Sequence, residues 1–220
     1  MSIIHLGRWQ DTLADVEPDA VICDPPFGKR THAGQKHKRN DGSTGIATTG
    51  LNYDHWTPRD VAVFVAHWSE RTSGWMACLT SHDLIPAWEA AFRANGRYVF
   101  APVPCVMRGM TVRLQGDGPS SWTVHLMVAR HRTRAAMKWR TLQGAYVGPR
   151  DSARLCKGGK PLWLIRDIVR DYSNEGDLIC DPMAGGGTAA VVAAEMGRRF
   201  IGAELNPATN AAAVSRLAGA

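Results

Sequence analysis

The sequence predicts an α/β fold with a mostly parallel central sheet flanked by helices, built as a single domain. Short apolar runs that suit buried strands alternate along the chain with longer segments that suit helices. Such alternation is typical of strand–helix–strand units with parallel strands. At 220 residues, the chain can bury one good core but hardly two.

The expected elements follow from the local pattern of apolar and polar residues. Residues 28–52 are polar, basic and glycine-bearing, and a loop of that length in a compact domain is normally functional or disordered. Residues 131–158 show no clean period. In chain order, the sequence predicts an opening strand and turn at 5–13, strands at 20–23, 75–79, 98–103, 122–129, 178–180 and 199–203, and helices at 58–71, 83–94, 161–172, 188–196 and 207–217.

The first chemical motif is Asp24-Pro25-Pro26-Phe27, which directly follows the strand expected at 20–23. Neither proline can donate a ladder hydrogen bond, so the strand must end there. Asp24 and Phe27 are therefore expected on a stiff turn at the carboxyl end of a strand, where open α/β sheets place their ligands. The Asp24 carboxylate and the Pro25 carbonyl can accept both hydrogens of one amino group, and the Phe27 ring offers a stacking face to a flat base.

The second motif, Asp181-Pro182-Met183-Ala184-Gly185-Gly186-Gly187-Thr188, lies between a short strand and an Ala/Val-rich helix. Glycines let a backbone approach a ligand closely, and the N–H groups at a helix amino terminus suit a carboxylate. Glu204 ends the next strand and is well placed to accept from ribose hydroxyls. A glycine loop with an acid about 20 residues later also fits the loose dinucleotide pattern, so a nicotinamide or flavin site is a rival interpretation. A P-loop is excluded because no Gly-Lys-Ser/Thr follows.

Together, these motifs resemble those of the DNA amino-methyltransferases, which methylate adenine N6 or cytosine N4 with S-adenosylmethionine. Asp24-Pro25-Pro26-Phe27 is similar to the family's catalytic tetrapeptide, and residues 181–188 are similar to its cofactor loop, usually Asp-Pro-Phe-x-Gly-x-Gly-Thr. Lys160-Pro161 matches a Lys-Pro element that precedes this loop. The order, with the catalytic turn first, resembles the circularly permuted beta arrangement. The resemblance covers residues 3–28 and 157–217 well, and 53–130 only in outline.

The resemblance implies a Rossmann-like methyltransferase fold, S-adenosylmethionine as cofactor and no metal. It assigns catalysis to Asp24, Pro25, Pro26 and Phe27. An Asp at the head of the tetrapeptide favours adenine over cytosine within the family, and N4-cytosine methylation stays as the alternative. The resemblance assigns cofactor binding to a larger set that spans both motifs: Cys23, Lys160, Pro161, Asp181, Pro182, Met183, Ala184, Gly185, Gly187, Thr188 and Glu204.

Two positions depart from the family pattern. An acidic residue that contacts the adenine of the cofactor often follows the glycine equivalent to Gly7, but Arg8 stands there. Asp11, in the following turn, is a candidate substitute. Met183 replaces the commoner aromatic residue of the cofactor loop. Both departures concern the details of adenine binding and leave the assignment intact.

Two functions from other classes are alternatives. A dinucleotide-dependent oxidoreductase would need further strands after Glu204 to complete its binding unit, and few residues remain. A non-catalytic nucleic-acid-binding homologue is disfavoured by the intact tetrapeptide and glycine loop. Pro104-Cys105 resembles the nucleophile of the cytosine C5 methyltransferases, but it precedes the glycine loop and lacks the partner residues. We interpret it as a chance dipeptide.

The net charge of +6 is unevenly placed along the chain. One basic cluster follows the catalytic turn and another precedes Lys160-Pro161, both in loop-like sequence. These basic clusters indicate a partner with a phosphate backbone, and we expect double-stranded DNA. We therefore expect basic, DNA-contacting insertions at about 28–52 and 131–158 within one domain spanning 1–220. The candidate DNA-binding residues are Lys29, Arg30, Lys36, Lys38, Arg39, Arg132, Arg134, Lys138 and Arg140.

The size, apolar content and cysteines of the chain limit its expected oligomeric state and cellular compartment. Because only the two basic insertions are free to read bases, one copy could cover little of a duplex, and we expect a homodimer.

No apolar run approaches the roughly 18 residues that span a membrane, and the amino terminus lacks the layout of a signal peptide. The five cysteines are scattered and show no metal-binding spacing. We expect a reduced, cytoplasmic protein without structural zinc. Trp56 and Trp139 adjoin the basic stretches, and packing is favoured for both over contact with bases.

Overall fold

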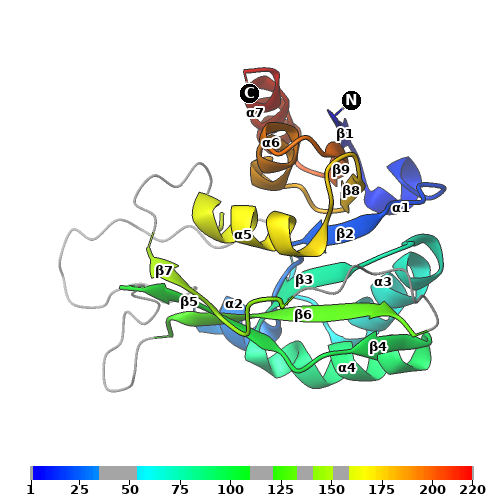
Figure 1. Cartoon of the computed structure of the whole chain (residues 1–220), viewed down its shortest axis with the longest axis vertical. Coiled ribbons are helices and arrows are strands. Elements are labelled where there is room, and N and C mark those ends of the chain that lie inside the picture. The colour runs from blue at the N-terminus through cyan, green and yellow to red at the C-terminus, as the bar shows by residue number, and fades with distance from the viewer. Residues whose placement is uncertain (1, 35–53, 110–120, 133–140, 151–158, 220) are drawn as a thin grey trace.

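One sheet organises the chain in the computed structural model, which describes residues 2–34, 54–109, 121–132, 141–150 and 159–219. Helices cover both of its faces (Figure 1). In spatial order the strands are β1 (Ser2–Leu6), β9 (Arg199–Glu204), β8 (Leu178–Asp181), β2 (Ala20–Cys23), β3 (Met76–Thr80), β6 (Thr123–His131), β5 (Val103–Arg108) and β7 (Tyr146–Pro149), and β4 (Arg97–Val99) pairs with β6.

The strands from β1 to β3 in this order all pair in parallel, and β7 is parallel to β5. Only β6 runs antiparallel to its neighbours β3, β4 and β5. The predicted α/β class with a mostly parallel sheet is therefore confirmed.

The two strands that carry the motifs are direct neighbours. Ala20 of β2 pairs with Ile179 of β8, and Val21 pairs with Cys180. Because the two strands are parallel, the turns that follow them leave the same edge of the sheet. The carboxyl ends of β1, β9 and β3 lie at this edge too, which is where open α/β sheets bind ligands.

The core has two halves, one on each face of the sheet, because successive strand residues point to opposite sides. Ala20 and Ile22 pack with α5 (Leu162–Tyr172), α6 (Thr188–Glu195) and α7 (Pro207–Ala218). Val21 and Cys23 pack on the other side with α1 (Trp9–Thr12), α3 (Pro58–Arg71) and α4 (Ile85–Ala94). Strands β2 and β3 are buried along their whole length, which explains their continuous apolar sequence.

Local capping sets the helix boundaries. The Thr57 side chain accepts a hydrogen bond from the Asp60 backbone N–H, and the Asp60 carboxylate accepts one from Thr57 N at 2.8 Å, so α3 begins with a capping box. Asn206 caps α7 by accepting from Thr209 N at 3.0 Å. Helices α3, α5, α6 and α7 lie where the sequence predicts them. The predicted helix at 83–94 divides into a short 3₁₀ turn, η1 (His82–Leu84), and α4.

The single strand predicted at 98–103 is wrong. Val99 of β4 faces Ala129 of β6, but Val103 of β5 faces Leu126. From Val99 to Val103 the chain advances four residues, while the paired segment of β6 advances three. This extra residue is a β-bulge in the strand beside β6. Pro102 lies inside it, and its missing N–H explains why continuous pairing stops there.

Three more segments differ from the sequence predictions. The first strand begins at Ser2 rather than within 5–13, and residues 9–12 form α1. The predicted loop 28–52 opens with a short helix, α2 (Lys29–Gly34), and the unperiodic stretch 131–158 contains β7. Both elements are too short to leave a periodic signal. Residues 35–52, 133–140 and 151–158 of the two basic insertions lie outside the described residues. Contact of the insertions with DNA stays a prediction.

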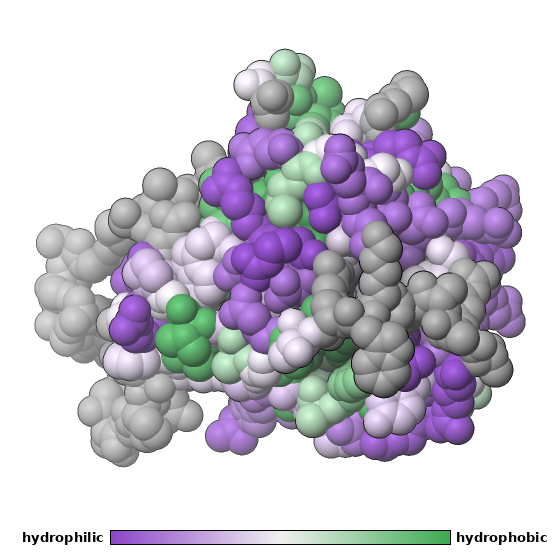
Figure 2. Space-filling model, in the orientation of Figure 1, coloured by the Kyte–Doolittle hydropathy of each residue, from purple (hydrophilic) through white to green (hydrophobic). Residues whose placement is uncertain are grey.

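The face shown in Figure 2 is largely hydrophilic over α5. Arg166 of α5 pairs with Glu195 of α6 at 2.5 Å, and Arg170 pairs with Asp167 at 2.7 Å. Within the described part of the chain, no helix combines the length and the apolar character that crossing a membrane requires.

Arg97 is a fully buried cation that ties β4 to the end of α3. Its guanidinium group donates to the backbone carbonyls of Ser69 at 3.0 Å, Thr72 at 2.6 Å and Gly74 at 2.8 Å. These carbonyls end α3 and lead into β3, so the side chain replaces the helical partners that they lack.

We predict that Arg97→Met lowers the free energy of unfolding by about 2–4 kcal/mol, because several carbonyls in the core lose a charged donor. Arg93→Met is the matched control: Arg93 is exposed and makes an i,i+4 pair with Glu89, worth about 0.5 kcal/mol or less. Urea unfolding followed by circular dichroism measures both. Equal stabilities of the two variants would contradict the role given to Arg97.

Candidate active site

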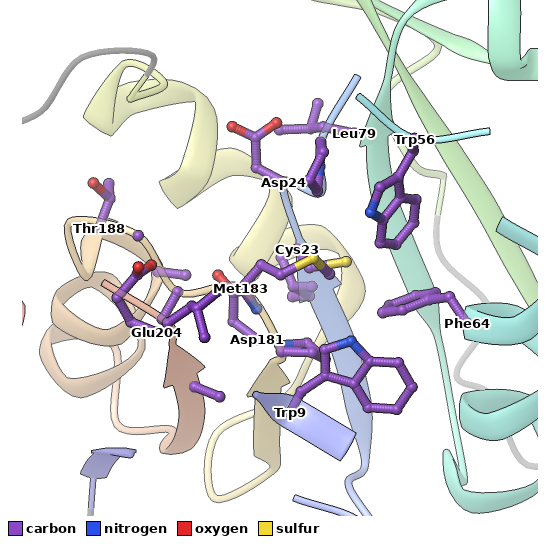
Figure 3. A pocket seen from close by; sticks show the side chains of 18 of the residues that line it. Trp9, Cys23, Asp24, Trp56, Phe64, Leu79, Asp181, Met183, Thr188 and Glu204 are labelled. Atoms are coloured by element: carbon purple, nitrogen blue, oxygen red, sulfur yellow. Dashed lines mark hydrogen bonds between the residues drawn. The ribbon is translucent and has the colours of Figure 1, made fainter. Parts of the chain in front are cut away.

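A cavity of about 460 Å³ opens at the carboxyl edge of the parallel strands. Its wall is built from the turns after β1, β2, β8 and β9, together with residues of α3 and α5. In Figure 3, Thr188 and Glu204 stand on one side, Trp56 and Phe64 stand on the other, and Met183 and the Asp24 carboxylate lie between the two sides.

Most of the residues predicted for the site line this cavity. Asp24 and Pro26 of the tetrapeptide do so, while Pro25 is buried in the turn and Phe27 lies against Lys160. Pro161 and Gly187 stand at the first turns of α5 and α6 and do not line the cavity. All the other predicted cofactor residues line it: Cys23, Lys160, Asp181, Pro182, Met183, Ala184, Gly185, Thr188 and Glu204.

Backbone contacts hold the catalytic turn from two sides. Trp56 N donates to Phe27 O at 3.1 Å, and Gly28 N donates to the Ser81 hydroxyl at 2.9 Å. A side chain at Gly28 would displace the exposed Asp83 carboxylate, which packs against this glycine. The turn is therefore fixed by the segment before α3 and by the end of β3.

Lys160 joins the two motifs through its side chain. Its Nζ lies 2.5 Å from Asp24 Oδ2 and 4.6 Å from the centroid of the Phe27 ring. The other carboxylate oxygen, Asp24 Oδ1, is buried and accepts no hydrogen bond from the described residues. Buried acceptors are normally paired, so this oxygen is ready to accept from a ligand.

The loop after β8 is closed by its own hydrogen bonds. Met183 N donates to Asp181 Oδ1 at 3.0 Å, and Gly187 N donates to Ala184 O at 2.9 Å. Gly185 and Gly187 have φ angles of 51° and 73°, a left-handed conformation that glycine adopts without strain.

The last helix fastens this loop from outside. Arg216 of α7 donates to Gly186 O at 3.0 Å and to Thr188 Oγ1 at 3.3 Å. Because Gly186 and Thr188 both line the cavity, the position of α7 is coupled to the shape of the site.

The turn after β1 differs from the family pattern, as the sequence indicates. Arg8 and Gln10 line the cavity, and Asp11, the candidate substitute for the missing acid, does not. Glu204 faces the cavity from β9, where its Oε1 accepts from Asn206 N at 2.7 Å.

Carboxyl groups and basic groups both line the cavity: Asp24, Asp60, Asp181 and Glu204 lie there with Arg8, Arg59 and Lys160. The pKa of Asp181 is raised to about 8, mainly because the carboxyl group is buried. The hydrogen bond from Met183 N–H lowers this pKa, and the neighbouring Asp24 and Glu204 carboxylates raise it. A cationic ligand would relieve this repulsion, whereas an anionic one would add to it.

The four cysteines within the described residues are all buried: Cys23, Cys78, Cys105 and Cys180. Burial raises the pKa of Cys105 to about 12, so its thiol stays protonated at neutral pH and cannot act as a nucleophile. Burial also raises the pKa of Cys23, whose sulfur lies 3.6 Å from that of Cys78. No group of three His, Cys, Asp or Glu residues in the described ranges is arranged to hold a metal ion.

The candidate DNA-binding residues are only partly described. Lys29 and Arg30 are exposed on α2, directly after the catalytic turn, and Arg132 is exposed at the end of β6. Residues outside the described ranges make up the rest of that set: Lys36, Lys38, Arg39, Arg134, Lys138 and Arg140.

The sequence alone did not identify the aromatic wall of the cavity, formed by Trp9, Trp56 and Phe64. Trp56 packs 5.3 Å from Phe64 and 6.1 Å from Trp88 between ring centroids, so the expected packing is present, yet its edge also reaches the cavity. Trp9 follows the end of β1, and the strand-end rule could have found it. Phe64 gives no signal beyond the period of its helix.

The sequence of this chain is similar to known DNA methyltransferases over part of its length. Residues 127–214 match a family model described as DNA methylase, of the N6/N4 type. Type II methyltransferase M1.MboII of Moraxella bovis is 49% identical over 47 residues, 21% of this chain and 18% of that protein. DNA adenine methyltransferase YhdJ of Escherichia coli strain K12 is 47% identical over 47 residues, 21% of this chain and 16% of that protein. The aligned segments thus span less than a fifth of these relatives.

Solved structures match over the whole fold. The M1.HpyAVI–SAM complex superimposes with a TM-score of 0.74 at 18% identity, covering 99% of this chain and 100% of that one. The PvuII DNA methyltransferase, named as cytosine-N4-specific, gives a TM-score of 0.67 at 13% identity, covering 98% of this chain and 86% of that one.

The resemblance to the DNA amino-methyltransferases is confirmed. The Rossmann-like methyltransferase fold predicted from it is confirmed as well. These relatives include a protein named for adenine and one named for cytosine N4, so the target base is a separate question.

The raised pKa of Asp181 makes the stability of the fold depend on pH. Below about pH 4 the carboxyl group is protonated in both the folded and the unfolded chain. Between that pH and about 8, the unfolded carboxyl ionises while the folded one keeps its proton, so its contribution to stability falls as the pH rises. Above about 8 both forms are ionised and the contribution stays level.

We predict that Asp181→Asn removes this dependence, because the amide oxygen can still accept from Met183 N but the side chain cannot ionise. The free energy of unfolding of the variant, minus that of the unsubstituted protein, should rise by up to about 1.4 kcal/mol per pH unit between about pH 5 and 8. Urea titrations across this range measure it, with Glu70→Gln, 82% exposed at its side chain, as control. A difference independent of pH would contradict the prediction.

Proposed function

We propose that this protein transfers a methyl group from S-adenosylmethionine to the exocyclic amino group of a base in DNA, with adenine N6 as the favoured target. The observation that carries the proposal is the position of Asp24. Its carboxylate stands on a fixed turn, with one buried oxygen unpaired among the described residues, in the same cavity as the glycine loop.

A similar structure solved as a SAM complex supports S-adenosylmethionine over a dinucleotide. The cavity lining mixes carboxyl groups with the basic residues Arg8, Arg59 and Lys160, so the choice between the two ligands does not rest on its charge. The first turn of α6 offers N–H groups to the carboxylate of the cofactor, and Glu204 is placed for its ribose hydroxyls.

The chain's own residues bind and orient the base. S-adenosylmethionine, when bound, supplies an electrophilic methyl group. The Asp24 carboxylate and the Pro25 carbonyl accept the two amino hydrogens, which favours a pyramidal nitrogen whose lone pair points at the methyl carbon. Positioning of this kind can lower a barrier by about 7–11 kcal/mol. The released proton can leave through Asp24 or through water.

The base must leave the duplex to reach Asp24, at a cost of a few kcal/mol. Stacking on the Phe27 ring can return about 1–3 kcal/mol of this cost. Phe27 lies next to Asp24 through their shared contact with Lys160, so the carboxylate and the ring can hold one base together.

The preference for adenine rests on the Asp at the head of the tetrapeptide. One similar protein is named as an adenine methyltransferase, and one similar structure as cytosine-N4-specific. N4-cytosine methylation is therefore the second candidate for the same site.

Double-stranded DNA in the cytoplasm is the proposed substrate, held by a homodimer. The exposed Lys29 and Arg30 follow the catalytic turn directly, where they can contact phosphates beside a base that enters the cavity. A second copy would extend the covered length of duplex beyond what one chain of 220 residues can reach.

Plasmid DNA incubated with the protein and isotopically labelled S-adenosylmethionine tests the proposal. Nucleoside mass spectrometry should then find labelled N6-methyladenine, and sequencing of the modified sites gives the recognition sequence. Labelled N4-methylcytosine would move the target to cytosine. Absence of label from both would reject the proposed reaction.

Calorimetric titration should show micromolar-range binding of S-adenosylmethionine and of its demethylated product, and no such binding of NAD. Gly185→Val should weaken this binding at least about tenfold. A side chain at Gly185 would enter open cavity space, and the φ of 51° at this residue is a backbone conformation that valine rarely adopts. Gly144→Val, at a glycine with nothing within 4 Å of an added Cβ and no positive φ, is the control. Tight NAD binding would favour the oxidoreductase alternative.

Asp24→Ala should bind S-adenosylmethionine nearly normally but lose methyl transfer by about 10²–10³ or more, since it removes a preorganised acceptor. Glu70→Ala removes an exposed carboxylate of α3 that does not line the cavity, and it should keep full activity. Single-turnover rates on unmethylated plasmid measure both. Near-complete turnover by Asp24→Ala would remove the tetrapeptide from the mechanism.

A further inference from the structure

Lys160 already makes the two contacts that the proposed reaction requires of a target base. Its Nζ lies 2.5 Å from Asp24 Oδ2 and 4.6 Å from the centroid of the Phe27 ring. We propose that the Lys160 ammonium group is a resident substitute for the target amino group and keeps the Asp24–Phe27 site closed until a base displaces it. This inference rests on the proposed function and adds a residue that controls access to the same site.

The ammonium group and an exocyclic amine share the chemistry that this site recognises. Both present N–H donors to a carboxylate, and both place a positively polarised group against an aromatic face. A base stacked on the face of Phe27 that Lys160 covers would occupy the volume that holds Lys160 Nζ. The lysine therefore competes with a base that binds on this face.

The second oxygen of Asp24 shows that the closed arrangement is incomplete. Asp24 Oδ1 is buried and accepts no hydrogen bond from the described residues. An unpaired buried acceptor is unfavourable. Lys160 pairs with Oδ2 and leaves Oδ1 without a donor among the described residues. An entering amino group can donate one hydrogen to Oδ1 and the other to the Pro25 carbonyl, which offsets part of the cost of displacing the ammonium group.

The position of Lys160 in the chain allows it to withdraw. Its backbone directly precedes Pro161, which accepts from Ile165 N at the start of α5, so the main chain is anchored. The ammonium group ends a flexible four-carbon stem and lines the cavity that the glycine loop shares. The side chain can thus move within the cavity while α5 stays in place.

This competition predicts a selection among bases. Adenine and cytosine carry an exocyclic amino group and can replace the ammonium group at Asp24. Thymine carries none, so its entry would remove the partner of Asp24 without supplying another, and the pair should stay closed. Lys160 therefore lowers the apparent affinity for bases that carry an amino group and leaves the binding of thymine unchanged.

Binding of homo-oligonucleotides of about twelve nucleotides, measured by fluorescence anisotropy for oligo(dA), oligo(dC) and oligo(dT), tests the inference. The ratio of the oligo(dT) Kd to the oligo(dA) or oligo(dC) Kd isolates the amino group from the general attraction to phosphates. Lys160→Met should raise this ratio at least about fivefold, because a competitor that lowers the fraction of open sites is gone. Lys160→Arg keeps a cation and should stay near the unsubstituted protein.

Two controls separate this effect from loss of charge or of fold. Arg93→Met removes an exposed cation of α4 that does not line the cavity, and it should leave the ratio unchanged. Adding Asp24→Asn to Lys160→Met should cancel the gain, because the acceptor of the amino group is weakened. A far-UV circular dichroism spectrum and a melting temperature of Lys160→Met that match those of the unsubstituted protein show that the fold is intact.

The outcomes distinguish this inference from the proposed reaction. If the protein methylates DNA but Lys160→Met leaves the ratio unchanged or lowers it, the ammonium group does not compete and the inference is overturned. If the ratio rises while the unsubstituted protein methylates no base, the amine-selective site stands and the proposed reaction falls.

Discussion

Parallel pairing of β2 with β8 is the constraint on which the rest of the site depends. The pairing of Ala20 with Ile179 and of Val21 with Cys180 brings together two turns that are far apart in sequence. Because both strands end at the same edge, the acid of one turn and the glycines of the other must face a common space. A slip of one residue would turn every side chain of β2 to the opposite face, and Asp24 would leave the cavity.

The sequence predicts the parts of the structure that depend on local rules. Proline after a short apolar run ends β2, and the glycine loop followed by an Ala-rich segment marks the start of α6. These signals lie within a few residues of the features that they specify. The bulge between β4 and β5 arises instead from a register shift of their shared neighbour β6, which the local pattern at 98–103 does not contain. Strand β7 is short and gains its place only by pairing with β5.

The same distinction holds within the site. Asp24, Asp181 and Glu204 could be named from the sequence because each lies at the carboxyl end of a strand. The contact of Lys160 with Asp24 joins residues 136 positions apart, and motif spacing placed this lysine only with the cofactor loop. Its partners follow from the depth at which α5 packs on the sheet, a tertiary property. The hold of Arg216 on the glycine loop is likewise invisible in the sequence, since exposed helix ends often carry arginine.

The aromatic wall of the cavity is continuous with the aromatic core behind it. Trp9 contacts Phe64 at 5.8 Å, Phe64 contacts Trp56 at 5.3 Å, and Trp56 stacks on the fully buried Trp88 at 6.1 Å between centroids. Indole emission depends on local polarity and on transfer of excitation between nearby rings. A ligand that enters beside Trp9 and Trp56 therefore changes the surroundings of an optically coupled group, and the protein carries its own fluorescent reporter of occupancy.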